Sequence, residues 1–205
     1  MIIEGHRLQT SGEQVSDVEV IHHESPNQYG EMDSIWCQLH HYIDSRDAEE
    51  PIDWFLRTDS NASAHLYVMR DRFIHQFVDF NCGAWHSGEA QLDGRSDRYG
   101  SINLCSIGLE FEGNGQLVRD KGVWRREWSN REYNIDRVID CRHQLGGVAC
   151  GWTTFTEWQV RMAMQLSQLL SVYSPIIKGH YDVSWPRKVD PGPLWPIEAI
   201  RRASA

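Results

Sequence analysis

One short segment near the C-terminal end gathers side chains that could bind a metal ion and stabilise charge. A histidine, a lysine and a carboxylate fall within eleven residues there, at His180, Lys188 and Asp190. The same segment contains residues that pin a loop and hold its side chains at fixed distances, namely Pro186, Pro191, Gly192 and Pro193. A neutral imidazole and a carboxylate are good ligands for Zn²⁺, and a neighbouring ammonium can stabilise a developing oxyanion. The alternative is a surface loop with an ordinary Asp–Lys pair.

A catalytic zinc site needs a third protein ligand and an open position for water. We expect this ligand to be a histidine at the end of a strand elsewhere in the chain. The β-branched run Val18–Ile21 ends at His22, which is placed for this role, and His23 is the alternative. His65 and His75 fall inside strand patterns, where single histidines are more often hydrogen-bonded residues of the core or the surface.

A second chemical pattern lies in Ser106–Gly113, where apolar and other residues alternate. In a strand, this alternation places Glu110 and Glu112 on one face and the apolar side chains on the other. Two carboxylates on one buried face are costly unless solvent or a cation offsets their charge. The pattern therefore indicates either a solvated sheet edge or acidic residues beside a cation.

Three other periodic segments predict elements that position these residues. Ala64–Met69 and Phe73–Val78 are strand patterns separated by the polar turn Arg70-Asp71-Arg72, which predicts a hairpin. Apolar residues at helical spacing predict an amphipathic helix over Met32–Tyr42.

A longer helix is expected in the C-terminal third of the chain. Thr154 and Glu157 have the spacing of a capping box, and an apolar stripe at helical spacing follows them. We expect the stripe to pack in the core and Pro175 to end the helix. Before this helix, residues 114–152 are polar and lack a clean period, which indicates a long insertion or a partly helical excursion.

Length and composition are those of about one globular domain. The chain has 205 residues and a mass of 23.8 kDa, and 40% of its residues are hydrophobic. Its 29 acidic side chains exceed its 20 lysines and arginines, which gives a net charge of −9. This balance argues against nucleic acid as a partner, because phosphate binding needs a basic surface. No apolar run is long enough to predict a membrane helix, so we expect no membrane partner.

Two further expectations concern the cellular setting. The N-terminal residues contain no basic region followed by an apolar stretch, so no secretory signal is predicted. We therefore expect synthesis in the cytoplasm, with release to the cell envelope requiring a phage pore or another export route. Five cysteines without a CxxC spacing favour reduced thiols, although Cys141 and Cys150 flank a Gly-Gly turn and could lie close together.

Taken together, these motifs resemble those of a known enzyme family. Five blocks carry the resemblance, in the family's order: Val20–Ser25, Ser63–His65, Ala84–Gly88, Ser106–Gly113 and Gly179–Pro193. On these blocks the chain is similar to the zinc-dependent type 2 N-acetylmuramoyl-L-alanine amidases. That family includes cell-wall-recycling amidases, phage endolysins and peptidoglycan recognition proteins.

The resemblance implies a fold, a cofactor and a set of site residues. The implied fold is a single α/β (α+β) domain over residues 1–205, with core blocks over 18–193 and an insertion at 114–152. A mixed central β-sheet would be flanked by helices, with zinc in a surface cleft. The zinc ligands carried over by position are His22, His180 and Asp190. Glu110 would be the catalytic carboxylate and Lys188 the transition-state cation. Three further residues match positions near the substrate groove: Trp85, His86 and Asn103.

The implied reaction is zinc-dependent hydrolysis of the amide bond between N-acetylmuramic acid and L-alanine, in peptidoglycan or in muropeptides. Glu110 would transfer the water proton to the leaving amine, and Lys188 would help to neutralise the oxyanion. The alternative is a non-catalytic peptidoglycan-binding module of the recognition-protein type. Such members lose a metal ligand, whereas all three positions are filled here. A zinc peptidase acting on the stem peptide is a third interpretation, which the cleavage products would distinguish.

Overall fold

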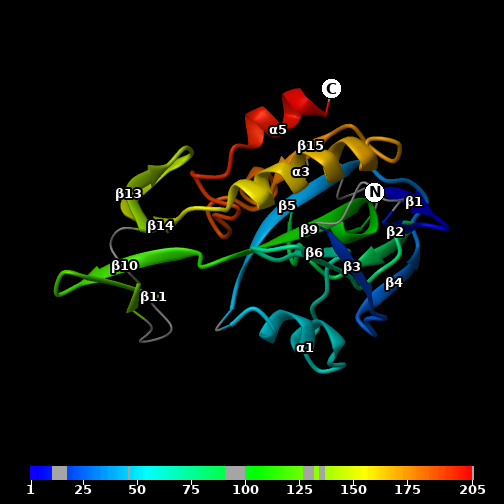
Figure 1. Cartoon of the computed structure of the whole chain (residues 1–205), viewed down its shortest axis with the longest axis horizontal. Coiled ribbons are helices and arrows are strands. Elements are labelled where there is room, and N and C mark those ends of the chain that lie inside the picture. The colour runs from blue at the N-terminus through cyan, green and yellow to red at the C-terminus, as the bar shows by residue number, and fades with distance from the viewer. Residues whose placement is uncertain (11–17, 46, 91–99, 127–131, 134–136, 205) are drawn as a thin grey trace.

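A mixed β-sheet forms the centre of the protein, with α3 and α5 over one face and α1 on the other (Figure 1). The computed structural model describes residues 1–10, 18–45, 47–90, 100–126, 132–133 and 137–204. The strands of the central sheet are, in spatial order, β15 (Ile177–Gly179), β5 (Cys37–Asp44), β9 (Ser106–Gly113), β6 (Leu66–Val68), β7 (Phe73–Gln76) and β3 (Glu19–His22). Only β6 and β7 pair antiparallel within this sheet, so the predicted mixed sheet flanked by helices is confirmed.

Short helices and ribbons complete the core of the fold. The helices are α1 (Glu50–Leu56), the 3-10 helix η1 (Ile102–Leu104), α3 (Glu157–Leu170), α4 (Tyr181–Ser184) and α5 (Ile197–Ala203). Two antiparallel ribbons lie beside the sheet: β1 (Ile2–Glu4) with β2 (Arg7–Gln9), and β4 (Gln28–Glu31) with β8 (Cys82–Ala84). In the part of the chain that the structure describes, no helix is long and apolar enough to cross a membrane.

Strand β9 separates the apolar core from the polar side of the sheet, as its alternation predicts. Ile107, Leu109 and Phe111 are fully buried and pack with α3 and α5 in the main core. Glu110 and Glu112 point to the opposite face because side chains alternate along a strand. The predicted hairpin is also present, since β6 and β7 pair antiparallel around the Arg70-Asp71-Arg72 turn.

The segment predicted as a helix over Met32–Tyr42 is instead a strand, β5, which begins at Cys37. It lies between β15 and β9 and is parallel to both. Both faces of such a strand are covered, so its sequence does not need to alternate between apolar and polar residues. The helical spacing of its apolar residues therefore has no structural meaning.

Helix α3 begins two residues later than its predicted cap. Thr156, rather than Thr154, is the N-cap: its hydroxyl accepts a hydrogen bond from Gln159 N at 3.1 Å. The Gln159 side chain in turn accepts one from Thr156 N at 3.1 Å, which completes the capping box. The buried Gln159 amide also donates to the Glu112 carbonyl at 2.9 Å, which ties this start to β9. The helix ends at Leu170, before the predicted stop at Pro175, and its apolar stripe packs in the core as expected.

The excursion between β9 and α3 forms a second sheet, so the predicted helical content is wrong for the residues described. Its antiparallel strands are, in order, β12 (Glu132–Tyr133), β11 (Val123–Arg126), β10 (Gln116–Asp120), β14 (Gly146–Thr153) and β13 (Val138–His143). Positive φ angles at Gly146 and Gly147 (111° and 91°) make the tight β13–β14 turn that glycine favours. Cys141 and Cys150 are direct partners across this hairpin, and both are free thiols.

Candidate metal centre and active-site cleft

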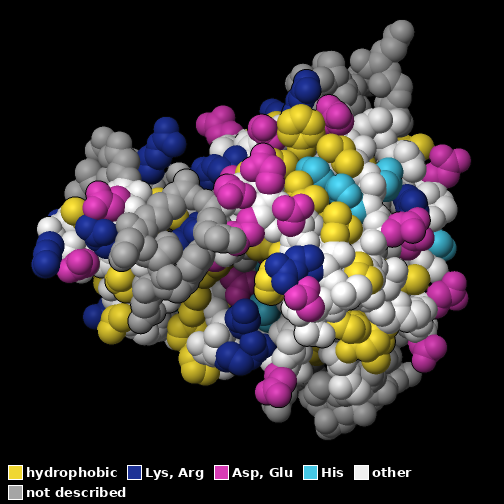
Figure 2. All heavy atoms as spheres, turned by 90° about the horizontal axis from the view of Figure 1, so that it is seen from below, with side chains coloured by type: hydrophobic (Ala, Val, Ile, Leu, Met, Phe, Trp, Pro, Cys, Tyr) yellow, Lys and Arg dark blue, Asp and Glu magenta, His cyan; other side chains and the backbone are white. Residues whose placement is uncertain are grey.

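A cleft of about 620 Å³ opens on the α1 side of the central sheet. Its walls come from β5, α1, the loop after β8, and the segment from His180 to Asp190. The face seen in Figure 2 is hollowed at its centre, where a carboxylate and an imidazole lie recessed beside Lys or Arg side chains. The residues predicted to do chemistry therefore lie largely in one depression.

Three ligand-type atoms converge at the floor of this cleft. His41 Nδ1, His180 Nδ1 and Asp190 Oδ2 lie 2.9 Å from one another in every pair. The three residues are 1%, 2% and 6% exposed, so water does not screen them. Two of them, His180 and Asp190, are predicted ligands, whereas His41 is not.

Backbone pairing explains why these side chains meet. Parallel strands β5 and β9 place His41 directly beside Glu110 on the same face of the sheet. His180 follows β15, the other neighbour of β5, and its N–H donates to the His40 carbonyl at 3.0 Å. The next amide, Tyr181 N, donates to the Asp190 carbonyl at 3.0 Å, which closes the ligand segment on itself.

A chain of hydrogen bonds assigns the protons of the His41 ring. The Ser106 hydroxyl donates its one proton to the Ile102 carbonyl at 2.7 Å, so its oxygen accepts from His86 Nε2 at 3.2 Å. His86 Nδ1 is therefore an acceptor, and His41 Nε2 donates to it at 3.0 Å. The remaining nitrogen of a neutral His41, Nδ1, is a lone pair that points into the triangle.

The His180 ring is fixed in the same way. Its Nε2 donates to the Ser87 carbonyl at 2.9 Å, so in the neutral ring that a metal ligand requires, Nδ1 is a second lone pair facing the triangle. Burial, followed by the nearby His180, lowers the pKa of His41 to about 4, so the His41 ring is neutral at pH 7.

Two lone pairs and a carboxylate oxygen within 2.9 Å repel one another unless a cation lies between them. Tetrahedral ligands at about 2.0–2.1 Å from a metal lie about 3.3 Å apart, close to the observed spacing. Imidazoles whose second nitrogen donates to a fixed acceptor are also the usual form of histidine ligands. The residues present therefore fit a divalent metal ion.

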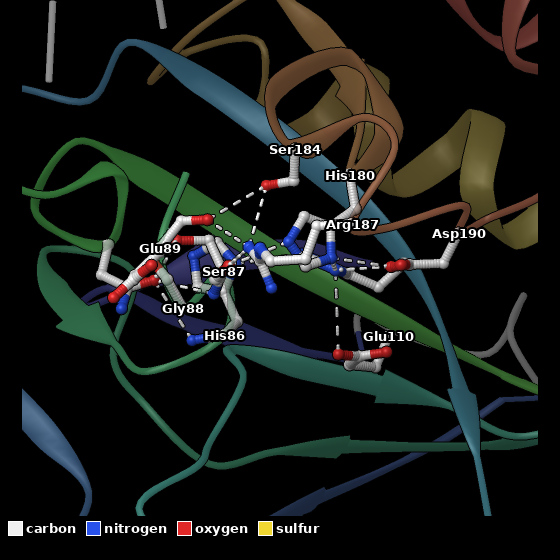
Figure 3. A network of polar contacts seen from close by, with 11 residues as sticks. His86, Ser87, Gly88, Glu89, Glu110, His180, Ser184, Arg187 and Asp190 are labelled. Carbon is white, nitrogen blue, oxygen red and sulfur yellow. Dashed lines mark hydrogen bonds and ion pairs between the residues drawn. The ribbon is translucent and has the colours of Figure 1, made fainter. Parts of the chain in front are cut away.

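Glu110 lies beside this triangle. Its Oε1 lies 4.0 Å from His41 Nδ1, and its Oε2 has no hydrogen-bond partner among the described residues. Figure 3 shows the Glu110 carboxylate below His180 and Asp190, pointing toward them. Burial, followed by the negative charge of Asp190, raises the pKa of Glu110 well above its usual value, and Lys188 opposes this shift. A carboxyl group with a raised pKa at this position is suited to accept a proton and to deliver it.

The second carboxylate of β9 has a structural role. Glu112 Oε2 accepts a hydrogen bond from Arg70 N at 2.8 Å, so it supports the β6–β7 turn. Lys188 lines the cleft together with Glu110, and its backbone N–H donates to the Ser184 carbonyl at 3.0 Å. The structure thus brings the two predicted catalytic side chains into one cleft.

His22 is not part of the cluster, and its assignment as a ligand is wrong. It ends β3, at the opposite edge of the sheet, and β9, β6 and β7 lie between β3 and β5. Four strand spacings separate β3 from β5, or about 19 Å. Neither ring nitrogen of His22 has a hydrogen-bond partner within the described part of the chain. In the triangle, the third position is taken by His41.

The sequence contained a signal for His41 that the helical interpretation concealed. His40 and His41 are consecutive, and consecutive residues of a strand face opposite sides. His40 turns into the core, where Trp195 Nε1 donates to its Nδ1 at 3.2 Å, and His41 turns to the cleft. Treating Cys37–Asp44 as a strand would have placed one histidine on the same side as Glu110.

The three predicted substrate contacts lie in different places. Trp85 lines the cleft, and its indole N–H has no partner among the residues described. His86 lines the cleft too, but its ring nitrogens hold His41 and Ser106. Asn103 is only 5% exposed, and its Oδ1 accepts from Ser87 N, Ser87 Oγ and His86 N. The structure therefore corrects Asn103 from a substrate contact to a support of the loop that holds His180.

Comparison with known protein families identifies the family of this chain. The family Amidase_2, described as N-acetylmuramoyl-L-alanine amidase, matches residues 13–193, which include all three residues of the triangle and both catalytic candidates. The chain belongs to this family. The resemblance found in the sequence is thereby confirmed.

Relatives of known activity are similar over about two thirds of this chain. The 1,6-anhydro-N-acetylmuramyl-L-alanine amidase AmpD of Escherichia coli is 30% identical over 136 residues, which are 65% of this chain and 53% of that protein. AmpD of Haemophilus influenzae is 27% identical over 135 residues, or 63% of this chain and 52% of that protein. The chain thus spans about half the length of the curated relatives it matches.

Solved structures share the fold of this family member. A selenomethionine derivative of AmpD aligns over 100% of both chains with a TM-score of 0.64 and 18% identity. The amidase AmiD of E. coli aligns over 98% of this chain and 65% of that chain, with a TM-score of 0.53 and 22% identity.

Proposed function

We propose that this protein hydrolyses the amide bond between N-acetylmuramic acid and L-alanine in muropeptides or peptidoglycan, and that zinc is its cofactor. One observation carries the proposal: His41 Nδ1, His180 Nδ1 and Asp190 Oδ2 converge at the floor of a cleft that also holds Glu110 and Lys188. Membership of the amidase family gives this arrangement its reaction.

The donor set favours zinc over harder cations. Two imidazoles and one carboxylate supply nitrogen and oxygen ligands, whereas Mg²⁺ and Ca²⁺ prefer oxygen alone. Three protein ligands are also the usual number in catalytic zinc sites. When bound, zinc supplies Lewis acidity that activates water and polarises a carbonyl group.

Glu110 is placed to transfer the proton. Its Oε1 lies 4.0 Å from His41 Nδ1, and the residue lines the cleft where a water molecule and the scissile amide would meet. A buried carboxyl with a raised pKa can accept a proton from water and then deliver it to the leaving amine. Without that protonation the amine is a poor leaving group.

Lys188 supplies positive charge in the cleft that Glu110 also lines. As the carbonyl carbon becomes tetrahedral, its oxygen gains negative charge, which an ammonium in a partly buried site stabilises. Lys188 lies two residues from Asp190, so the same segment fixes a metal ligand and this cation.

Structural neighbours support a muropeptide substrate. The AmiD structure is a complex with the substrate anhydro-N-acetylmuramic acid-L-Ala-D-γ-Glu-L-Lys. In this chain, Trp85 and the 43%-exposed Trp54 line the same cleft as Glu110, and indoles of this kind pack well against sugar rings and peptide backbones. Substrate contact by Trp85 is part of the proposal.

The test is digestion of soluble anhydro-muropeptides and of purified sacculi, side by side, with and without a chelator. We expect release of stem peptides with a free L-alanine amine, loss of this activity after chelation, and recovery with added zinc. Cleavage only between amino acids would identify a peptidase instead. Binding of muropeptide by the zinc-loaded protein without any product would identify a binding module and overturn the proposal.

A further inference from the structure

The β13–β14 hairpin of the second sheet packs against the segment that carries His180, Lys188 and Asp190. We propose that this hairpin positions the catalytic segment: His143 fixes Trp185, and through it Lys188, while Trp152 fixes the backbone next to Asp190. The inference rests on the proposed function for the role of Lys188 and on the metal site for the role of Asp190.

His143 is the first point of contact. It is only 4% exposed, and its ring stacks on Trp185 with centroids 4.8 Å apart and planes 22° from parallel. The edge of Tyr181 meets the same ring at 4.8 Å and 77°. His143 is held from its own side as well, because its Nδ1 accepts from Leu145 N at 3.1 Å.

Trp152 is the second point of contact. It is 3% exposed, and its indole N–H donates to the Cys141 carbonyl at 3.2 Å, which ties the ring to the hairpin. The ring lies directly against Gly192, where an added Cβ would lie 2.8 Å from Trp152 Cζ3. Gly192 has a φ of +85°, so glycine suits both the close approach and the backbone conformation. This contact lies two residues from Asp190.

The opposite side of the segment is held by the loop that follows β8. Arg187 Nη2 donates to the Ser87 carbonyl at 3.0 Å, to the Ser184 hydroxyl at 3.0 Å and to the Glu89 carbonyl (Figure 3). Arg187 thus faces the β8 loop, while Trp185 faces the hairpin. Lys188 follows directly after these two anchors, so its backbone is restrained from both sides.

Such restraint matters because catalysis depends on small distances. A misplacement of about 1 Å, caused away from the reacting atoms, can reduce turnover about 10²-fold. The rings of His143 and Trp152 are not part of the triangle and do not line the cleft, so we expect their effect on the reaction to pass through the segment they hold. They are positioning residues rather than catalytic ones.

The contacts made by His143 and by Trp152 predict losses in two different quantities, kcat and zinc retention. For His143→Ala we expect kcat on an anhydro-muropeptide to fall about tenfold or more, with KM and zinc content unchanged, because Lys188 loses its alignment. His143→Phe keeps a flat ring against Trp185 and is expected to restore most of kcat. For Trp152→Ala we expect zinc to be lost to a competing chelator at an at least tenfold lower chelator concentration, because the backbone beside Asp190 loosens.

The control is Val148→Ala, at the tip of the same hairpin, where the side chain is 76% exposed. It should match the unsubstituted protein in kcat and in zinc retention. If His143→Ala accumulates unfolded, His143→Leu fills the same space without a ring and should still show the loss that His143→Phe repairs. Equal kcat for His143→Ala and Val148→Ala, or no repair by His143→Phe, would overturn the role of His143. Zinc retention by Trp152→Ala equal to that of Val148→Ala would overturn the proposed role of Trp152.

These outcomes are separable from failure of the proposed function. If the unsubstituted protein cleaves no muropeptide, the proposed reaction fails and the role of Lys188 with it. The chelator competition on Trp152→Ala and Val148→Ala still decides whether the hairpin supports the metal site.

Discussion

The Nδ1 atoms of His41 and His180 lie 2.9 Å apart, and in the neutral form of each ring this is the nitrogen that carries the lone pair. Such an approach of two neutral imidazoles is unfavourable by itself, because the lone pairs of the two facing nitrogens repel each other. The second nitrogen of each ring is committed to a fixed acceptor, which prevents either ring from turning away. The fold therefore preorganises these nitrogens in a geometry that becomes favourable only when a cation binds between them.

His41→Ala should abolish stoichiometric zinc binding and muropeptide cleavage, because a single imidazole and one carboxylate remain. Metal content after dialysis, measured by elemental analysis, checks this. His22→Ala is the matched control and should retain one zinc per chain and normal activity, since β3 lies at the far edge of the sheet. A full complement of zinc in His41→Ala would show that the triangle is not the metal site.

Glu110→Gln should keep its zinc and lose turnover by about 10²–10⁴-fold, because an amide of the same shape cannot accept the proton. Steady-state rates together with metal content check this. Glu112→Gln, two residues along the same face, changes a carboxylate that only supports Arg70 N, so its kcat should stay within a few fold of normal. Comparable losses in both variants would mean that charge on this face, rather than proton transfer by Glu110, sets the rate.

His86→Phe should weaken zinc binding by about 10–100-fold, because the acceptor that orients His41 is lost. His86→Asn places an oxygen near the position of Nδ1 and should recover most of the affinity. Titration against a chelator measures both. An increase in KM with unchanged zinc affinity would instead support the sequence-based prediction of His86 as a substrate contact.

Acid should destabilise the fold through buried neutral histidines. Burial lowers the pKa of His65 to about 4, and burial together with His23 lowers the pKa of His75 to about 4. An unfolded chain takes up a proton at each of these rings near pH 6.5, while the folded chain does not until about pH 4. The free energy of unfolding should thus be highest above pH 6.5 and fall by about 1.4 kcal/mol per pH unit per ring down to pH 4.

Urea unfolding of the metal-free protein between pH 7 and pH 4 measures this dependence. In the unsubstituted protein, Gly108 N donates a hydrogen bond to His65 Nδ1 at 2.9 Å. His65→Asn keeps an acceptor for this N–H but has no titrating ring. It should be less stable at pH 7 and show a shallower loss toward pH 4. Parallel curves for the two proteins would contradict the buried neutral state of His65.

The parts of the site that were predictable from sequence are those fixed by local constraints. His180, Lys188 and Asp190 lie on one short segment rich in proline and glycine, so their proximity follows from the chain itself. Glu110 was predictable because β9 has one apolar and one polar environment, and its sequence alternates accordingly. Family resemblance then supplied the roles, which the spacing alone did not.

The third ligand was not predictable in this way, because it depends on the order of strands. A pair of consecutive histidines occurs both at the end of β3, which carries His22, and within β5, which carries His41, so this signal does not choose between them, and only the pairing of β5 between β15 and β9 brings His41 to Glu110. A strand covered on both faces lacks alternation, so β5 was predicted as a helix. The second sheet was missed for a related reason: its strands are held by hairpin turns and by one another rather than by a strong apolar pattern.

The chain leaves the amidase core at Asn114 and rejoins it at Thr153, where the two side chains are joined by a hydrogen bond of 3.3 Å. All six strands of the central sheet lie outside this interval, so a direct splice of the two ends would leave the order of the sheet unchanged. The interval is thus an insertion between β9 and α3 that leaves the order of the central sheet intact, while Arg126 pairs with Asp44 and the β13–β14 hairpin contacts the segment that carries Asp190. The catalytic residues of the cleft and the hairpin proposed to position them therefore belong to separate parts of the chain, so each can be varied while the other is kept.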